Sequence, residues 1–132
     1  MAHVDSSLDI VIPCLNAAGC LPATLAALCT GEGRVIVADG GSSDDSVALA
    51  RAAGARAIAA PRGRGPQLAA GAAAGQAPWL LFLHADTRLG SGWWSAVRRH
   101  VEDPANRERA GYFRLRFDCP SALNCNGRLR GG

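Results

Sequence analysis

The sequence predicts an α/β domain built on a mostly parallel sheet with helices on its faces. Short apolar or β-branched runs alternate with segments whose apolar residues recur at helical spacing. That alternation implies parallel strands joined by right-handed crossovers. At 132 residues, 48% of them hydrophobic, the chain has room for one domain with a modest core. We therefore expect a single domain over residues 1–132.

Five runs predict strands. The first is expected to end at Pro13. The fourth, residues 79–83, is apolar throughout and is therefore expected to be buried on both faces. The last alternates like a strand with one solvated side. The five runs are residues 8–12, 34–38, 56–60, 79–83 and 112–117.

Helices are expected between these strands. Leu21, Leu25 and Leu28 recur at helical spacing and define the first helix. Gly54 is the expected C-terminal cap of the second, and Pro61–Pro66 is expected to be loop. The remaining predicted helices are residues 46–53, 67–74 and 95–101.

The sequence argues against a membrane-spanning segment, a signal peptide, a disulfide framework and a zinc site. No apolar run approaches the roughly 18 to 20 residues that span a bilayer, and the N-terminus has no basic segment followed by an apolar one. Five cysteines without a Cys-x-x-Cys pair indicate neither a disulfide framework nor a zinc site, and they suit a reducing cytosol. We expect a cytoplasmic protein. Whether it lies at the inner face of the cell membrane is left open.

The two halves of the chain differ in charge. Residues 1–60 hold three arginines and six acidic residues, whereas residues 61–132 hold eleven arginines and five. A basic second half can attract phosphates or an anionic membrane surface. Few aromatic residues lie among the arginines, so a solvated basic face explains them better than nucleic-acid binding. All 14 basic residues are arginine, a coding bias typical of GC-rich bacterial genomes.

The stretch after the second strand gives the strongest indication of chemistry. Asp39 ends a buried run and is followed by Gly40 and Gly41, which allow a sharp turn. Ser43 or Asp44 can then cap the next helix. Ligands of open α/β sheets bind just beyond the carboxyl ends of the strands, so Asp39 lies where a nucleotide would bind. An acidic turn that only caps a helix explains the same residues about equally well.

A second polar group follows the fourth strand. His84 and Asp86 are two residues apart, and on a strand they would point to the same face. An imidazole and a carboxylate in one cleft can hold a divalent cation, with substrate phosphates in its other positions. A purely structural strand end is at least as common. Because Asp39 and Asp86 both follow parallel strands, we expect them at the same edge of the sheet.

Three segments, in this order, resemble the motifs of the family 2 glycosyltransferases. They are Ile12–Asn16, residues 37–44 (Val-Ala-Asp-Gly-Gly-Ser-Ser-Asp) and residues 81–87 (Leu-Phe-Leu-His-Ala-Asp-Thr). The resemblance covers residues 8–117, leaves 118–132 as an irregular tail, and implies the nucleotide-binding GT-A fold. Within the family the chain looks similar to a bacterial subgroup with histidine at the first position of the Asp-x-Asp motif.

The resemblance implies nucleotide contacts at particular positions. Asp39 matches the aspartate that recognises the nucleobase, whereas the aspartate that follows it in the family is Gly40 here. Pro13 and Asn16 match a motif that lies beside the nucleotide. Arg64 is the best match to an arginine that the family often carries in the loop before the third helix.

The resemblance also implies a divalent metal, Mn²⁺ or Mg²⁺, that bridges the donor diphosphate. Asp86 matches the last aspartate of the Asp-x-Asp motif, which contacts the metal. His84 replaces the first aspartate, so one negative charge is missing. Since a protonated imidazole cannot bind a metal, we expect metal binding that is weaker and more sensitive to pH.

The implied reaction is inverting transfer of a sugar from a nucleoside diphosphate, expected to be uridine diphosphate, to an acceptor hydroxyl. The metal and Arg64 would offset charge on the leaving diphosphate, and a carboxylate would deprotonate the acceptor. In the family that base lies in a later segment, and nothing after Tyr112 matches it. We assign no catalytic base, Asp118 included, and we expect a chain truncated before the acceptor-binding half.

Two alternatives remain open. A non-catalytic nucleotide-sugar-binding fragment or pseudoenzyme explains the missing base and His84 equally well. A nucleotidyltransferase with Pro61–Pro66 as its phosphate loop is weaker, because that segment lacks the lysine of a phosphate-loop signature. The expected partners are a nucleoside diphosphate sugar and an unknown acceptor, without nucleic acid. Peripheral membrane association and self-association are left open.

Overall fold

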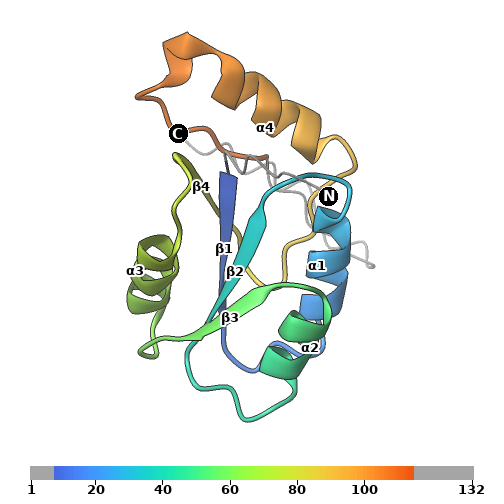
Figure 1. Cartoon of the computed structure of the whole chain (residues 1–132). Coiled ribbons are helices and arrows are strands. Elements are labelled where there is room, and N and C mark those ends of the chain that lie inside the picture. The colour runs from blue at the N-terminus through green and yellow to red at the C-terminus, as the bar shows by residue number, and fades with distance from the viewer. Residues whose placement is uncertain (1–7, 115–132) are drawn as a thin grey trace, which may run out of the picture. The chain divides into compact units, whose positions relative to one another are not determined.

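The computed structural model describes residues 8–114, and these form two compact units that divide between Arg98 and Arg99. The first unit contains a four-stranded parallel sheet in the order β3-β2-β1-β4, flanked by helices (Figure 1). This confirms the predicted α/β class. The strands are β1 (Leu8–Cys14), β2 (Arg34–Asp39), β3 (Arg56–Ala59) and β4 (Trp79–Phe82). The helices are α1 (Leu21–Leu28), α2 (Ser46–Ala52), α3 (Arg64–Ala74), α4 (Trp93–Glu102) and the short 3-10 helix η1 (Pro104–Asn106).

The central strand β1 is buried on both faces. Leu8, Ile10 and Ile12 pack with the leucines of α1 in the main core, on the face that α1 and α2 cover. Val11 points to the other face, where Gly71 of α3 lies so close that a Cβ on this glycine would clash with Val11. Helices α1 and α2 therefore cover one face of the sheet, and α3 covers the other (Figure 1).

Strand β4 lies at the edge of the sheet and differs from its prediction. It ends at Phe82, one residue early. Trp79 and Leu81 pack against the core, whereas Leu80 and Phe82 are 39% and 50% exposed. The prediction of burial on both faces is therefore wrong. The physical reason is the strand order, because α3 contacts β1 and β2 while β4 lies beyond them.

Pro13 lies inside β1 and does not end it, contrary to the prediction. Its neighbour Cys14 still pairs with Asp39 of β2. On the other side, the N–H of Leu83 donates to Val11 O. The next residue of β1 whose backbone N–H position faces β4 is Pro13. Because proline has no N–H, the ladder to β4 cannot continue past Leu83. After Leu83 the chain therefore leaves the sheet.

Other boundaries also differ from expectation. Helix α3 begins at Arg64, so the second half of the predicted loop Pro61–Pro66 is helical; proline is tolerated there because a first-turn N–H has no partner within the helix. Helix α4 is longer than predicted and begins at the buried Trp93. No strand is present over residues 112–114. The rest of that predicted strand and the predicted tail lie outside the described residues.

The second unit is described over residues 99–114. The ring Nε2 of His100 donates to Arg109 O at 3.0 Å, and Asn106 Nδ2 donates to His100 O at 3.1 Å. Tyr112 and Phe113 are exposed. Over residues 8–114, none of the helices combines the length and the apolar character needed to cross a membrane.

Asp9 joins three segments at the amino end of the sheet although it is completely buried. Its carboxylate accepts the N–H groups of Gln76 and Ala77 at 2.7 and 2.8 Å. Arg34 Nε also donates to it at 3.0 Å. Burial alone would raise the pKa of Asp9, but these donors outweigh it and hold the pKa below the ordinary value of 3.8. The ionised form of Asp9 is therefore the one that stabilises the fold.

Replacement of this carboxylate, Asp9→Asn, should lower the free energy of unfolding by about 2–3 kcal/mol at neutral pH. Because the folded pKa is lowered, the stabilisation is fully present above about pH 4 and is lost as the pH falls through the folded pKa. The two proteins should therefore converge in stability as the solution becomes acidic. Urea denaturation across that pH range measures the gap, and a gap that stays constant would contradict this role.

Candidate functional site

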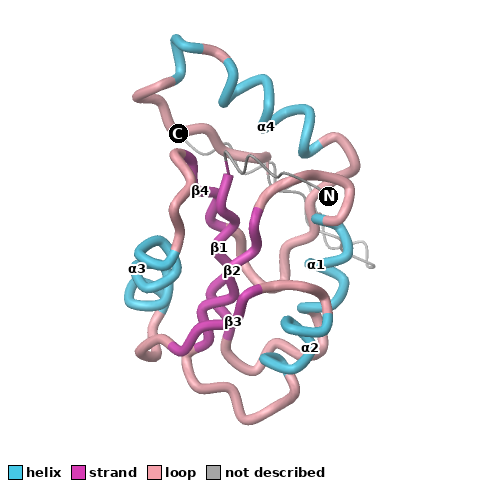
Figure 2. Tube along the Cα trace, viewed as in Figure 1, coloured by secondary structure: helices cyan, strands magenta, loops and turns pink. Residues whose placement is uncertain are grey.

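The segments that follow the strands meet at one edge of the sheet, which we call the carboxyl edge (Figure 2). It comprises the end of β1 with the loop after it (residues 13–18), the end of β2 with the loop into α2 (39–46), the loop after β3 with the first turn of α3 (60–67), and the residues after β4 (83–87). All six site residues that the sequence predicts belong to these segments. They are Pro13, Asn16, Asp39, Arg64, His84 and Asp86.

Asp39 folds the loop that follows β2. Its Oδ2 accepts the N–H groups of Gly41 and Ser42 at 3.1 and 2.9 Å, and its Oδ1 accepts the hydroxyl of Ser42. Gly41 has φ 101°, a left-handed conformation that glycine adopts without strain. The carboxylate is 8% exposed. Asp39 therefore has a structural role in this turn, and Oδ1 retains capacity to accept a further hydrogen bond.

The loops after β1 and β2 are bonded to each other. The N–H of Asn16 donates to Ser42 Oγ at 2.8 Å, and Asn16 Oδ1 accepts the N–H of Ser43 at 2.8 Å. Next to it, the N–H of Ala17 donates to the buried hydroxyl of Ser46 at 2.9 Å. Asn16 has φ 50°, which asparagine tolerates better than most residues. The two loops thus form one connected layer at the carboxyl edge.

Of the two caps predicted for α2, Asp44 contacts the first helical turn. Its Oδ1 accepts the N–H of Ser46 at 3.0 Å together with the Ser46 hydroxyl, and its Oδ2 accepts the N–H of Ala18 at 3.1 Å. The bond from the Ser46 hydroxyl is the main cause that lowers the pKa of Asp44. Asp45 occupies the N-cap position itself without a side-chain cap bond. Ser43, the other predicted cap, bonds to Asn16 instead.

Gln67 is a buried residue of this edge that sequence reasoning missed. Its Nε2 donates to Cys14 O at 2.8 Å and to Ala38 O at 2.9 Å, and its Oε1 accepts the N–H of Gly63 at 3.1 Å. It is only 4% exposed. One polar side chain in an otherwise small, apolar helical segment was the signal that could have identified it.

Arg64 is the first residue of α3 and is exposed. Its predicted place in a loop is therefore corrected to the first turn of a helix. The preceding Gly63 has φ 133°, so glycine is required where the chain enters α3. Through Gln67 this helix start is bonded to the ends of β1 and β2, which keeps Arg64 at the carboxyl edge.

His84 and Asp86 lie in a turn beyond β4, not on the strand. The N–H of Thr87 donates to His84 O at 3.1 Å and closes the turn, and both predicted ligands are exposed. The argument that two strand residues share a face therefore does not apply to them. The buried Thr24 of α1 donates its hydroxyl to Ala85 O at 2.6 Å and anchors the turn. Sequence reasoning missed Thr24, since a threonine on a helix face gives no signal by itself.

The donor set at this turn is one imidazole and one carboxylate. Among residues 8–114, no three His, Cys, Asp or Glu side chains lie close enough together to hold a metal ion. His84 and Asp86 could therefore supply only part of a coordination shell. Oxygen atoms of a bound diphosphate are the kind of ligand that would complete the shell of Mn²⁺ or Mg²⁺.

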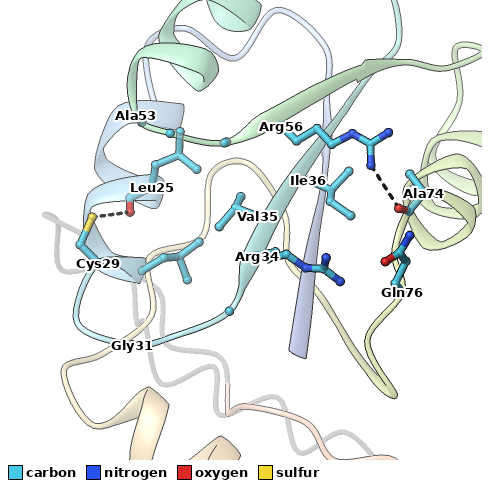
Figure 3. A pocket seen from close by; sticks show the side chains of 14 residues that line it. Leu25, Cys29, Gly31, Arg34, Val35, Ile36, Ala53, Arg56, Ala74 and Gln76 are labelled. Carbon is cyan, nitrogen blue, oxygen red and sulfur yellow. Dashed lines mark hydrogen bonds between the residues drawn. The ribbon is translucent and has the colours of Figure 1, made fainter. Parts of the chain in front are cut away.

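A cavity of about 460 Å³ lies at the opposite, amino end of β2 and β3 (Figure 3). Arg34 and Arg56 line it, but both guanidinium groups have partners. Arg34 pairs with Asp9, and Arg56 donates to Ala74 O at 3.3 Å near the end of α3. The cavity and the predicted site residues therefore lie at opposite ends of the strands.

Comparison with known proteins identifies the family of the chain. The model of glycosyl transferase family 2 matches residues 9–108. The chain belongs to this family. An uncharacterized glycosyltransferase of Mycobacterium bovis is 37% identical over 87 residues, 65% of this chain, and two Mycobacterium tuberculosis glycosyltransferases match equally well. The chain spans 39% of the length of these relatives.

Solved GT-A glycosyltransferases share the fold of this family 2 chain. S. aureus TarS, residues 1–349, superposes with a TM-score of 0.65 at 14% identity, over 72% of this chain and 32% of TarS. Glucosyl-3-phosphoglycerate synthase from Mycobacterium tuberculosis, in complex with uridine diphosphate, superposes with a TM-score of 0.57 at 25% identity. That match covers 67% of this chain and 36% of the synthase. The predicted GT-A fold is thus confirmed.

The turn that carries His84 and Asp86 should depend on Thr24. Thr24→Val has nearly the same shape but leaves Ala85 O without this donor, so the free energy of unfolding should fall by about 1–2 kcal/mol. Thr24→Ser keeps the hydroxyl and serves as the control. Amide exchange at Thr87, whose N–H closes the turn, should accelerate in the valine variant. Equal stability and equal exchange in wild type and Thr24→Val would show that the bond does not hold the turn.

Proposed function

We propose that this family 2 chain forms the donor site of a glycosyl transferase that moves a sugar, with inversion, from uridine diphosphate to an acceptor hydroxyl. The observation that carries the proposal is that Asp39, Arg64 and the turn of His84 and Asp86 all lie at the carboxyl edge of a GT-A sheet. Support for the nucleotide comes from the synthase that is 25% identical and was solved with uridine diphosphate.

Asp39 is proposed to bind the nucleobase. The imide N–H of uracil is a donor, and Asp39 Oδ1 is an acceptor at the carboxyl edge with the Ser42 hydroxyl already on it. Because the carboxylate is fixed by its own loop, it would accept that hydrogen bond without reorganising. Pro13 and Asn16 would lie beside the nucleotide, since their segment is bonded to the Asp39 loop.

Arg64 and the turn after β4 are proposed to bind the diphosphate. Arg64 stands at the start of α3, where the helix dipole adds to its positive charge. Asp86, together with His84, would hold a divalent ion against the phosphate oxygens. When bound, such an ion would neutralise charge on the leaving diphosphate. Solved forms of the synthase with Mn²⁺ and uridine diphosphate support a metal of this kind.

The acceptor and the base that deprotonates it are not assigned to any residue of 8–114. Asp118, the acidic residue considered in the sequence, lies outside the described part. A nucleotide-sugar-binding protein without transfer activity is the alternative, and the replacement of an aspartate by His84 is the feature that favours it. Sugar transfer to an acceptor separates the two.

We further propose a cytoplasmic protein that uses a nucleotide sugar and no nucleic acid, as one GT-A-like domain over residues 1–132. Cys14, the buried cysteine of β1, is compatible with this location, because burial raises the pKa of its thiol and keeps it unreactive. Peripheral association with a membrane stays a further proposal that rests on the arginine-rich second half.

Metal linkage is the direct test of the donor site. Calorimetry should show that uridine diphosphate binds the wild-type chain more tightly with Mn²⁺ than without it, and that Asp86→Asn abolishes this gain while most metal-free binding remains. His84→Asp should enlarge the gain, because it restores a negative charge. Asp45→Asn, which removes an exposed carboxylate at the start of α2, is the matched control and should change neither value. If Mn²⁺ leaves the wild-type affinity unchanged, the assignment of this turn is wrong.

A further inference from the structure

Both N–H donors and the carbonyl acceptor of the buried Gln67 side chain have hydrogen-bond partners. A glutamine side chain has two N–H donors and one carbonyl acceptor. Here the donors meet the carbonyls of Cys14 and Ala38, and the acceptor meets the N–H of Gly63. The reverse orientation would place oxygen against two carbonyls and NH₂ against an N–H, so the partners fix which way the amide points.

These three bonds join segments that are distant in sequence. Cys14 ends β1 just before the loop of Asn16, and Ala38 precedes Asp39 at the end of β2. Gly63 directly precedes Arg64. Gln67 thus connects the parts of the carboxyl edge that carry the proposed contacts with the nucleobase and the diphosphate. Its own polar groups are occupied, so it is positioned to act through those segments.

The contact with Gly63 also determines how α3 begins. The backbone N–H of Gln67 donates to Gly63 O at 2.9 Å, while its side chain accepts the N–H of the same glycine at 3.1 Å. The first is the ordinary backbone bond of the helix, and the second resembles one half of a capping box, in which a side chain near the helix start accepts the N–H of the N-cap residue. The place of Gly63, and of Arg64 next to it, therefore depends on Gln67.

Gly40 leaves the space that Gln67 occupies. A Cβ on Gly40 would lie 2.9 Å from both Cδ and Oε1 of Gln67, closer than such atoms approach in proteins. Gly40 is buried, and its φ is not left-handed, so room and not backbone conformation explains the glycine. The position after Asp39 and the side chain of Gln67 are therefore coupled.

We propose that Gln67 is a positioning residue of the donor site: it holds the start of α3, with Arg64, at a set place relative to the ends of β1 and β2. This inference rests on the proposed function, because it assigns Gln67 an effect on nucleotide binding. It predicts that loss of the amide weakens binding of uridine diphosphate in molecules that remain folded.

The test compares two buried polar side chains at opposite ends of β1. Gln67→Met keeps length and burial but removes all three bonds. Asp9→Asn serves as the matched control, since Asp9 is equally buried and bonds three partners at the amino end. Both variants should be less stable to urea. Calorimetry with uridine diphosphate and Mn²⁺, at a temperature where both are folded, should show about tenfold weaker binding for Gln67→Met and unchanged binding for Asp9→Asn.

A second variant covers the case in which Gln67→Met does not fold. Gly40→Ala displaces the amide without removing it and should also weaken nucleotide binding, whereas in a Gln67→Ala background the added methyl should cost little. Wild-type affinity in folded Gln67→Met or in Gly40→Ala, or an equal effect of Gly40→Ala in both backgrounds, would overturn the positioning role and leave the proposed function intact. A wild-type chain that binds no uridine diphosphate would overturn the proposed function and this inference with it.

Discussion

The structure depends on how the last backbone groups of the parallel strands find hydrogen-bond partners. Beyond β1 and β2 there is no further strand residue to pair with, yet these groups are buried. Cys14 O accepts both the N–H of Gly40 and the amide of Gln67, and Asp39 O accepts the N–H of Ala60. Since an unpaired buried carbonyl costs about 1–3 kcal/mol, these bonds hold the following loops to the sheet. The candidate site is built on those loops.

Helix α3 shows how buried polar groups and close packing act together. Gln67 bonds its start to the carboxyl edge, and Asp9 bonds Gln76 and Ala77 just after its end. Between them, Gly71 allows the helix to approach Val11 closely. Polar groups in such a position stabilise a fold only when all their partners are present, as they are here. The helix is thereby fixed at both ends, which gives Arg64 a defined place.

Much of the fold could be predicted from local pattern, and the site only in part. Alternating apolar runs and helical spacing identify β1 to β4 and α1 to α4, because those patterns reflect burial directly. The exposure of Phe82 could not be foreseen, since it depends on β4 being an edge strand. The six site residues were predicted from motif order, and they do lie at one edge. Gln67 and Thr24 were missed because their roles come from partners that are 29 to 61 residues away.

The central claim is that the carboxyl edge, and not the cavity at the amino ends of the strands, binds a nucleoside diphosphate together with a metal. Paramagnetic broadening of amide NMR signals by Mn²⁺, in the presence of uridine diphosphate, tests it most directly because the effect falls steeply with distance. The account predicts broadening at residues 40–42, 64–65 and 84–87, with Arg34 and Arg56 unaffected. Broadening centred on Arg34 and Arg56, or spread evenly over the chain, would contradict it.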